Sequence, residues 1–241
     1  GIVFLGNIDL QPTYIDNFDF RFEIFGDRAQ MFAISSFYKK FKNPIEVVAY
    51  DIAAPNQFTP RNSPEAEVLG IELEARKNFG FISDGLSNLS LNVNVSVIDS
   101  EIEMAKGEGQ EYESRLIFAR DGETIKDTRT LQGQSPYLIN AGLNYDNREL
   151  GLETGVFFNV QGKTLEVVGF GQNPDVFIQP FNSLNFNLAK AFGKEKNSKI
   201  SFKMENILDE KRQSFYESYG AADQNFSYRQ PGMALSLGYS L

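Results

Sequence analysis

The two side chains closest to a catalytic arrangement are Glu72 and Glu74, which stand two residues apart and therefore on one face of a predicted strand. Paired carboxylates can serve as general acid and general base in a hydrolase. The chain has no His and no Cys, however, so it lacks the commonest general base and any thiolate ligand or nucleophile. We therefore expect no enzyme activity, no catalytic residue, no metal site and no cofactor. The two carboxylates fit better as the lining of a polar lumen.

Two Gly-x-Gly pairs, Gly107/Gly109 and Gly169/Gly171, could in principle belong to nucleotide-binding loops. Neither pair lies between a strand and a helix, which is the context that phosphate binding requires. No acidic calcium-loop pattern is present either. The formal net charge is −9, whereas nucleic-acid binding relies on clustered Lys and Arg. The sequence therefore predicts no nucleic-acid partner.

Aromatic and charged residues in the predicted loops are the candidates for substrate binding. Rigid aromatic rings suit the capture of a sugar or an aromatic chelate. The same residues near strand ends could instead form the aromatic girdle of a membrane protein, and that alternative stays open. The candidate substrate-binding residues are Tyr112, Arg115, Phe170, Phe177, Phe215, Tyr216 and Tyr219.

The longest predicted loop, 101–135, mixes acidic and basic residues without periodicity. Contact with a cation or a metal chelate is one interpretation. The other, which we favour, is a solvated loop of mixed charge.

Alternation of apolar and polar residues predicts about nine strands, which would position these loops, and no amphipathic helix. In 17–25, for example, three Phe and an Ile alternate with Asn, Asp, Arg and Glu. The predicted strands are 17–25, 29–41 (which the pattern allows to continue through 45–50), 68–77, 89–98, 138–145, 150–160, 184–191, 199–206 and the closing strand in 230–241.

The connections between these strands alternate between short and long. Links after the odd-numbered strands are tight, whereas those after the even-numbered strands, such as 51–64 and 161–180, are long. An outer-membrane barrel has this layout, with short periplasmic turns and long extracellular loops. A β-sandwich mixes loop lengths at both ends, although its solvated face would show the same alternation. Nine is an odd count that leaves two open edges, so we expect the chain to be part of a larger barrel.

The last twelve residues form the most regular strand pattern. Apolar Met233, Leu235, Leu237, Tyr239 and Leu241 alternate with small or polar residues. A soluble domain would have to protect such an edge, whereas a barrel closes it and places an aromatic residue near the membrane interface. We interpret these five residues as the face of a closing strand that also guides barrel assembly.

Five segments, in order, resemble the C-terminal half of TonB-dependent outer-membrane receptors. Two departures from the family pattern occur in the last segment, where Met233 replaces a frequent Arg and Leu241 replaces the usual terminal aromatic residue. The segments are Asn7–Glu23 (NIDLQPTYIDNFDFRFE), Phe37–Glu46 (FYKKFKNPIE), Arg61–Ala75 (RNSPEAEVLGIELEA), Phe202–Asp209 (FKMENILD) and Arg229–Leu241.

The resemblance implies an all-β fold: residues 1–241 would be the C-terminal part of an antiparallel transmembrane β-barrel of about 22 strands. It also implies a plug domain and further strands outside these residues. The sequence is similar in character to those of receptors from Bacteroidota. The implied function is TonB-dependent import of an iron chelate, glycan or peptide through the outer membrane of a Gram-negative bacterium. The implied partners are outer-membrane lipid, the TonB–ExbB–ExbD motor acting through the plug, and the barrel-assembly machinery. The glycan- or peptide-importing subtype would add a surface lipoprotein.

Two alternatives differ in class from this receptor. One is a secreted β-sandwich that serves as a binding or adhesin module. The other is a barrel client whose terminal strand is engaged by an assembly partner through strand addition.

Overall fold

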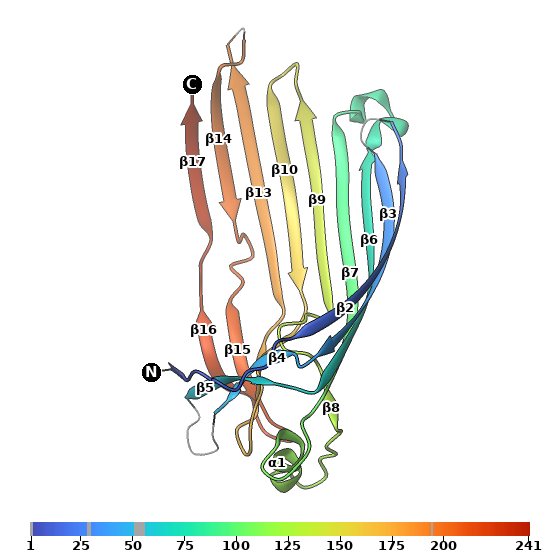
Figure 1. Ribbon diagram of the computed structural model, residues 1–241. Helices are drawn as coiled ribbons and strands as arrows, with labels where there is room; N and C mark the ends of the chain where they lie inside the picture. Colours follow the sequence, from blue (N-terminus) through green and yellow to red (C-terminus); the bar gives the residue numbers. More distant parts are fainter. Residues whose placement is uncertain (1, 28–29, 51–55, 194) are drawn as a thin grey trace.

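The computed structural model describes residues 2–27, 30–50, 56–193 and 195–241. Its main element is one antiparallel sheet of nine long strands in the order β17-β14-β13-β10-β9-β7-β6-β3-β2, with the short β8 paired to β7 (Figure 1). We call this sheet the wall, and each of its strands pairs with the wall strand that comes next along the chain. The nine are β2 (Tyr14–Phe25), β3 (Met31–Lys42), β6 (Glu65–Asn78), β7 (Leu89–Glu103), β9 (Tyr137–Asn147), β10 (Leu152–Gln161), β13 (Phe181–Phe192), β14 (Ser198–Glu205) and β17 (Ala234–Ser240).

The number and order of the predicted strands are confirmed. The continuation of the second strand through 45–50 is wrong, because β4 (Ile45–Ala49) leaves the wall and pairs with β5 (Gln57–Asn62) in a separate sheet. The predicted start of that second strand at 29 and part of the 51–64 connection fall at 28–29 and 51–55, outside the described residues.

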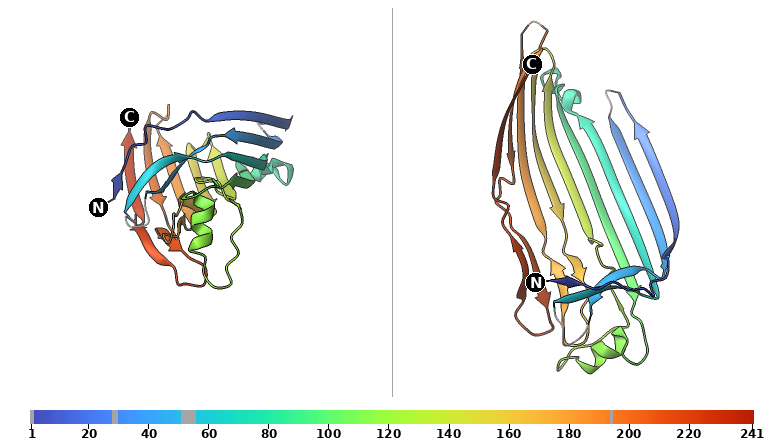
Figure 2. Two further views of the ribbon diagram at one scale, coloured as in Figure 1. Left: turned by 60° about the horizontal axis from the view of Figure 1, so that its bottom comes forward. Right: turned by 60° about the vertical axis from the view of Figure 1, so that its left-hand side comes forward.

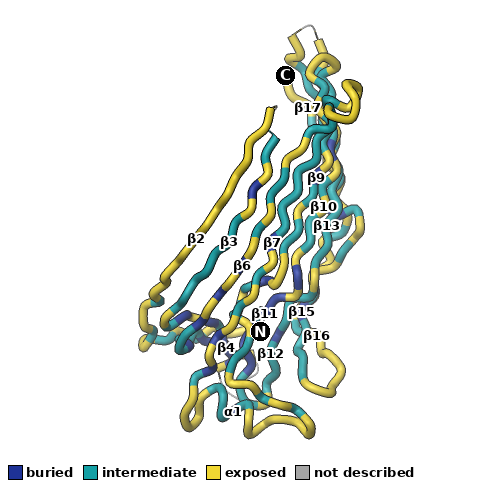
Figure 3. Tube along the Cα trace, turned by 90° about the vertical axis from the view of Figure 1, so that its right-hand side faces the viewer, coloured by how far each residue is buried: buried dark blue, intermediate teal, exposed yellow. Residues whose placement is uncertain are grey.

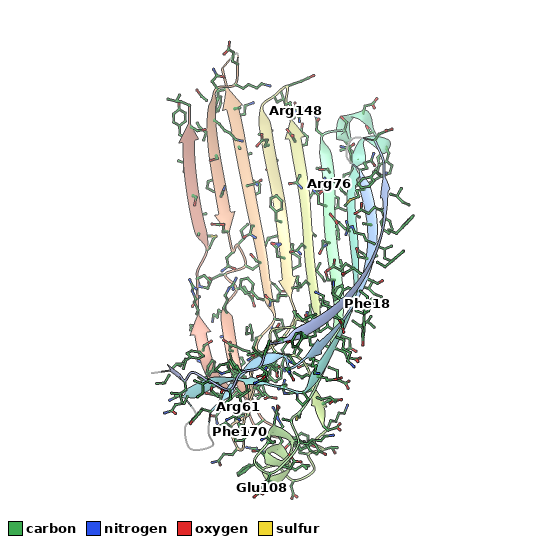
Figure 4. All side chains as sticks on the ribbon, in the orientation of Figure 1. Phe18, Arg61, Arg76, Glu108, Arg148 and Phe170 are labelled. Atoms are coloured by element: carbon green, nitrogen blue, oxygen red, sulfur yellow. The ribbon has the colours of Figure 1, made fainter. Side chains whose placement is uncertain are left out.

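The strand register keeps apolar and polar residues on opposite faces across the whole wall. On one face, Phe22 lies opposite Ile34, and the pattern continues to Phe202 opposite Leu237 at the other edge. The opposite face is polar, as in the row that places Glu74 opposite Asn94. Figure 4 marks Phe18 on the apolar face and Arg76 on the polar face. The large side chains of the apolar face are exposed in the chain alone, and Leu237 reaches 80% exposure.

The wall curves like part of a cylinder and has two unpaired edges, β2 and β17 (Figure 2). Short turns connect the strands at one end, including two 3-10 turns, η1 (Phe79–Phe81) and η2 (Asp84–Leu86). Gly151 closes one of these turns with φ of 62°, a left-handed conformation that favours glycine. The long connections all lie at the other end (Figure 1). The predicted alternation of short and long links is therefore confirmed.

The long connections are folded. One small sheet has the order β1-β5-β4 and another the order β11-β12-β15-β16. The predicted loop 101–135 begins inside β7 and contains a short helix and β8, so its description as an aperiodic loop is corrected. The additional elements are β1 (Val3–Phe4), α1 (Glu111–Ile117), β8 (Thr128–Arg129), β11 (Thr164–Val167), β12 (Asp175–Ile178), β15 (Arg212–Glu217) and β16 (Gln224–Arg229).

Buried residues gather among these folded loops (Figure 3), and most of the buried hydrophobic ones lie there rather than in the wall. One cluster joins Val48, Leu165 and Val168, and a second joins Phe58, Val167 and Val176. Each cluster combines residues from the β4–β5 hairpin with residues from β11, β12 or the turn between them. The loops thus share a core and form one cap at their end of the wall. Within the described residues, no helix is long and apolar enough to cross a membrane.

Candidate functional site

A buried network of charged side chains ties the loop cap together. Arg129 binds Glu46 through two hydrogen bonds of 2.9 and 2.6 Å, and its Nε donates to Glu111 at 2.6 Å. Arg115 forms a second two-point pair with Asp175, at 3.0 and 2.7 Å, and also contacts Glu111. Only 7% of the Arg129 side chain and 2% of the Glu46 side chain are exposed. Such paired, desolvated charges fix the relative positions of the segments that carry them.

The ionisation of this network follows from its pairing. Burial alone would raise the pKa of Asp175, but the Arg115 guanidinium outweighs burial and holds the pKa of that carboxyl below its ordinary value. Burial alone would lower the pKa of Arg129, but Glu46 and Glu111 reverse this and raise it. Both shifts favour the charged forms of Asp175 and Arg129.

The uncharged side chain of Gln132 links two loops by hydrogen bonds. Its side-chain nitrogen donates to the carbonyl oxygens of Val47 at 2.8 Å and Glu166 at 2.6 Å, while its side-chain oxygen accepts from the Val47 amide at 2.6 Å. The backbone of Val168 continues the connection, donating to Val47 and accepting from Ala49. The cap is consequently one connected unit rather than a set of independent loops.

Two cavities open in this cap, of about 280 and about 420 Å³. They share Arg120, Gln172, Asn173, Pro174 and Ser218, so they adjoin, and we call the pair the loop pocket. Its lining combines two guanidiniums and three carboxylates with amides, hydroxyls and aromatic rings. This chemistry suits a polar ligand that both donates and accepts hydrogen bonds.

The structure brings three of the seven predicted binding residues to the loop pocket. Tyr216 lines the larger cavity, and Arg115 and Tyr219 line the smaller one. The Arg115 guanidinium is already paired with Asp175, so it shapes the pocket rather than offering a free charge. Tyr219 is 53% exposed and is the most accessible of the three.

The other four predicted residues lie elsewhere in the cap. Phe177 packs on the core cluster of Val48 and Leu165, and Phe215 lies opposite it on the adjacent strand. The Phe170 ring lies 5.0 Å from the Arg61 guanidinium (Figure 4), and the Tyr112 ring lies 5.7 Å from the Lys106 ammonium. Their ligand contact stays a prediction that the geometry does not favour.

Sequence reasoning missed the residues that build the site. Glu111 and Arg129 belong to the segment interpreted as a solvated loop of mixed charge, yet only 11% and 7% of their side chains are exposed, because each pairs with a group of opposite charge. Arg115 was predicted as a binding residue, but its part in this network was not. Arg120 and Gln172 line both cavities and carried no motif. Of the five closing-strand residues, Leu235, Leu237 and Tyr239 are on the apolar face of β17, and Met233 and Leu241 flank the strand; their role in barrel assembly stays a prediction.

Comparison with known proteins identifies the family. The family model for the TonB-dependent receptor-like β-barrel matches residues 1–207 of the sequence. The chain belongs to this family. No curated protein sequence is significantly similar to it.

Solved structures of TonB-dependent receptors and related transporters share the fold. The ferric yersiniabactin uptake receptor FyuA from Yersinia pestis superposes with a TM-score of 0.61 at 16% identity, over 94% of this chain and 29% of that one. The copper transporter OprC gives 0.62 at 15% identity, over 96% and 31%. The outer membrane transporter YddB from Escherichia coli gives 0.58 at 13% identity, over 100% and 34%. The chain thus spans about a third of the length of these structures.

Family and fold together place the chain in the wall of a Gram-negative outer-membrane β-barrel. The alternative of a secreted β-sandwich is wrong, because the nine long strands form one continuous sheet whose two faces differ in polarity. The apolar face of a TonB-dependent receptor barrel contacts lipid, which explains why it is exposed in the chain alone.

Proposed function

We propose that this chain is the C-terminal part of a TonB-dependent receptor that imports a nutrient, such as an iron chelate, a glycan or a peptide. The chain supplies part of the barrel wall and the extracellular loop cap. The observation that carries the proposal is the combination of a two-faced wall with two unpaired edges, β2 and β17. Lipid leaves no partner for an unpaired strand edge, so further strands must complete the barrel.

The loop pocket is the surface on which we expect the nutrient to bind first. It lies in the cap, where a ligand arriving from outside meets the receptor. The Arg120 guanidinium donates one long hydrogen bond of 3.4 Å, to the Tyr219 carbonyl oxygen. Ser218 and Gln172 add neutral donors and acceptors beside it. The buried network below would hold these groups in place when the ligand binds.

The proposed receptor depends on partners outside this chain. Import needs the TonB–ExbB–ExbD motor, which would act through a plug domain, and a glycan or peptide receptor would add a surface lipoprotein. Insertion needs the barrel-assembly machinery. The unpaired β17 edge, with its exposed Leu235, Leu237 and Tyr239, is the element we expect this machinery to recognise by strand addition. A piece engaged in this way would be the assembly client considered above.

The import proposal is tested in the organism that makes the full receptor. We expect deletion of the receptor gene to abolish growth on one nutrient supplied as the only source of iron, carbon or nitrogen. Loss of TonB should abolish the same growth. Replacing Arg120 with Ala should weaken uptake of that nutrient while leaving the receptor in the membrane. Growth that is unchanged by both deletions on iron chelates, glycans and peptides would refute the proposal.

A further inference from the structure

On the polar face of the wall, the ring of Phe157 lies over two glycines. Phe157 belongs to β10, and the glycines are Gly142 on β9 and Gly155 on the same strand as the ring. A Cβ added to Gly142 would lie 2.9 Å from Cδ1 of the ring, and one added to Gly155 would lie 2.8 Å from Cε2 and Cζ. Opposite edges of the ring thus rest on the two glycines, so the ring lies flat on the sheet. The glycines are buried and Phe157 is half-buried, which leaves the other ring face open to the polar side.

Asparagine side chains surround this ring. In the antiparallel register, Asn140 lies opposite both Asn94 and Asn159, and Phe157 itself lies opposite Asn185. We call this set, with Phe157, the amide ring site. Its asparagines are Asn92, Asn94, Asn140, Asn144, Asn159, Asn185 and Asn187.

Much of the hydrogen-bonding capacity of these amides is unused. Within the described part of the chain, the side chains of Asn94, Asn144 and Asn187 have no hydrogen-bond partner. Asn159 uses one of its donors, on the Asn140 side-chain oxygen at 3.1 Å. Each free amide can both donate and accept, which matches the two capacities of a hydroxyl group.

Two charged side chains of opposite sign, Glu74 and Arg76, stand at the border of the site. Glu74 accepts a hydrogen bond of 2.9 Å from Arg21, and Arg76 donates to Asn92 at 2.9 Å. A cavity of about 210 Å³ opens here, lined by Glu74, Arg76, Phe157 and four of the asparagines. The lining holds one acidic and one basic side chain, so its formal charge is zero and gives no strong preference for an anion or a cation.

We propose that the amide ring site binds a neutral sugar ring on its passage through the receptor lumen. The C–H face of the sugar would stack on the open face of Phe157, and its hydroxyl groups would exchange hydrogen bonds with the surrounding amides. An uncharged polyol matches both the aromatic platform and the zero formal charge of the lining. This inference rests on the proposed import function and narrows the nutrient to a neutral glycan.

The test measures uptake in energised cells that carry the full receptor. The probes are radiolabelled neutral gluco-, xylo-, manno- and galacto-oligosaccharides, with ferric chelates and peptides as comparison substrates. We expect TonB-dependent uptake of at least one neutral oligosaccharide. Phe157→Leu should slow this uptake about 3- to 10-fold, the effect of losing one aromatic contact. Phe157→Tyr, which keeps the ring, should restore it.

Phe158→Leu is the matched control, because the adjacent side chain lies on the apolar face and cannot reach the site. Receptor amount in the membrane is measured for each variant, so a folding defect is recognised directly. If a neutral oligosaccharide is imported equally well by the wild type and Phe157→Leu, the inference is wrong. It is also wrong if the receptor imports only chelates or peptides, a result that would leave the import proposal standing.

Two further outcomes separate the remaining explanations. Absence of TonB-dependent uptake for every substrate class would overturn the import proposal itself. If Phe157→Leu lowers the thermal stability of the purified receptor while sugar uptake is unchanged, the site is a docking surface for another segment of the receptor, and sugar binding is refuted.

Discussion

Removing the guanidinium of Arg129 should detach the β4–β5 hairpin from the loop cap. Arg129→Met keeps much of the side-chain volume but leaves Glu46, which is 2% exposed, without its two-point partner. Breaking one side of a buried ion pair costs about 3–5 kcal/mol. Because every 1.4 kcal/mol changes an equilibrium constant tenfold, local opening should become on the order of 10³-fold more frequent.

Hydrogen exchange of the full receptor in detergent measures this opening. We expect faster exchange of the amides in β4 and of Gln132, whose backbone amide donates to Glu46, while the amides of the wall strands stay unchanged. Lys106→Met is the control, since it removes a solvent-exposed ion pair with Asp127 from the same segment. If Arg129→Met and Lys106→Met give the same exchange profile, the network does not hold the cap together and our reasoning fails.

Three other perturbations follow from the structure. Leu237→Arg should destabilise the barrel by about 2–4 kcal/mol in lipid, because it places a charge on the apolar face. Ser236→Arg, on the polar face, should be tolerated, and the free energy of unfolding by urea in bilayers distinguishes the two variants. Gly70→Val should lower the melting temperature because the new side chain overlaps the Phe37 ring, and the additional change Phe37→Ala should recover most of the loss. Pairing with Arg115 depresses the pKa of Asp175. The contribution of Asp175 to cap stability is therefore complete above its ordinary pKa of 3.8 and is lost as the pH falls through its lower folded-state pKa. A cap whose protease resistance already falls between pH 7 and 5 would contradict this.

The wall of this fold could be predicted from the sequence because one physical demand governs it. Lipid on one side and a polar lumen on the other impose a two-residue period, and Phe18 to Ile24 follow it without interruption. The alternation of short and long links then gave the strand order, since consecutive antiparallel strands pair with each other.

The cap could not be predicted in the same way, because it depends on contacts between distant segments. Glu46 and Arg129 are 83 residues apart, and alone each resembles any charged loop residue. The strand at Ile45–Ala49 looked like a continuation of the preceding strand because Asn43, with φ of 54°, gives only a weak signal for the turn that separates them.

The amide ring site was equally hidden. Phe157 and Phe158 are neighbours in the sequence, and only the register shows which ring faces the polar side. The glycines beneath Phe157 become meaningful only when β9 and β10 are paired, since Gly142 then lies directly opposite the ring. Alternation therefore predicts which face a residue occupies, and pairing determines what that residue can bind.

The orientation of the wall in the membrane is the central claim, and cysteine labelling tests it most directly. The chain has no Cys, so single cysteines can be introduced at Glu108 in the loop cap and at Arg148 in a short turn at the opposite end (Figure 4). In intact cells whose full receptor carries no other reactive cysteine, a membrane-impermeant maleimide should label Glu108→Cys. It should label Arg148→Cys only after the outer membrane is permeabilised. Labelling of Arg148→Cys and not Glu108→Cys in intact cells, or equal labelling of both, would contradict the account.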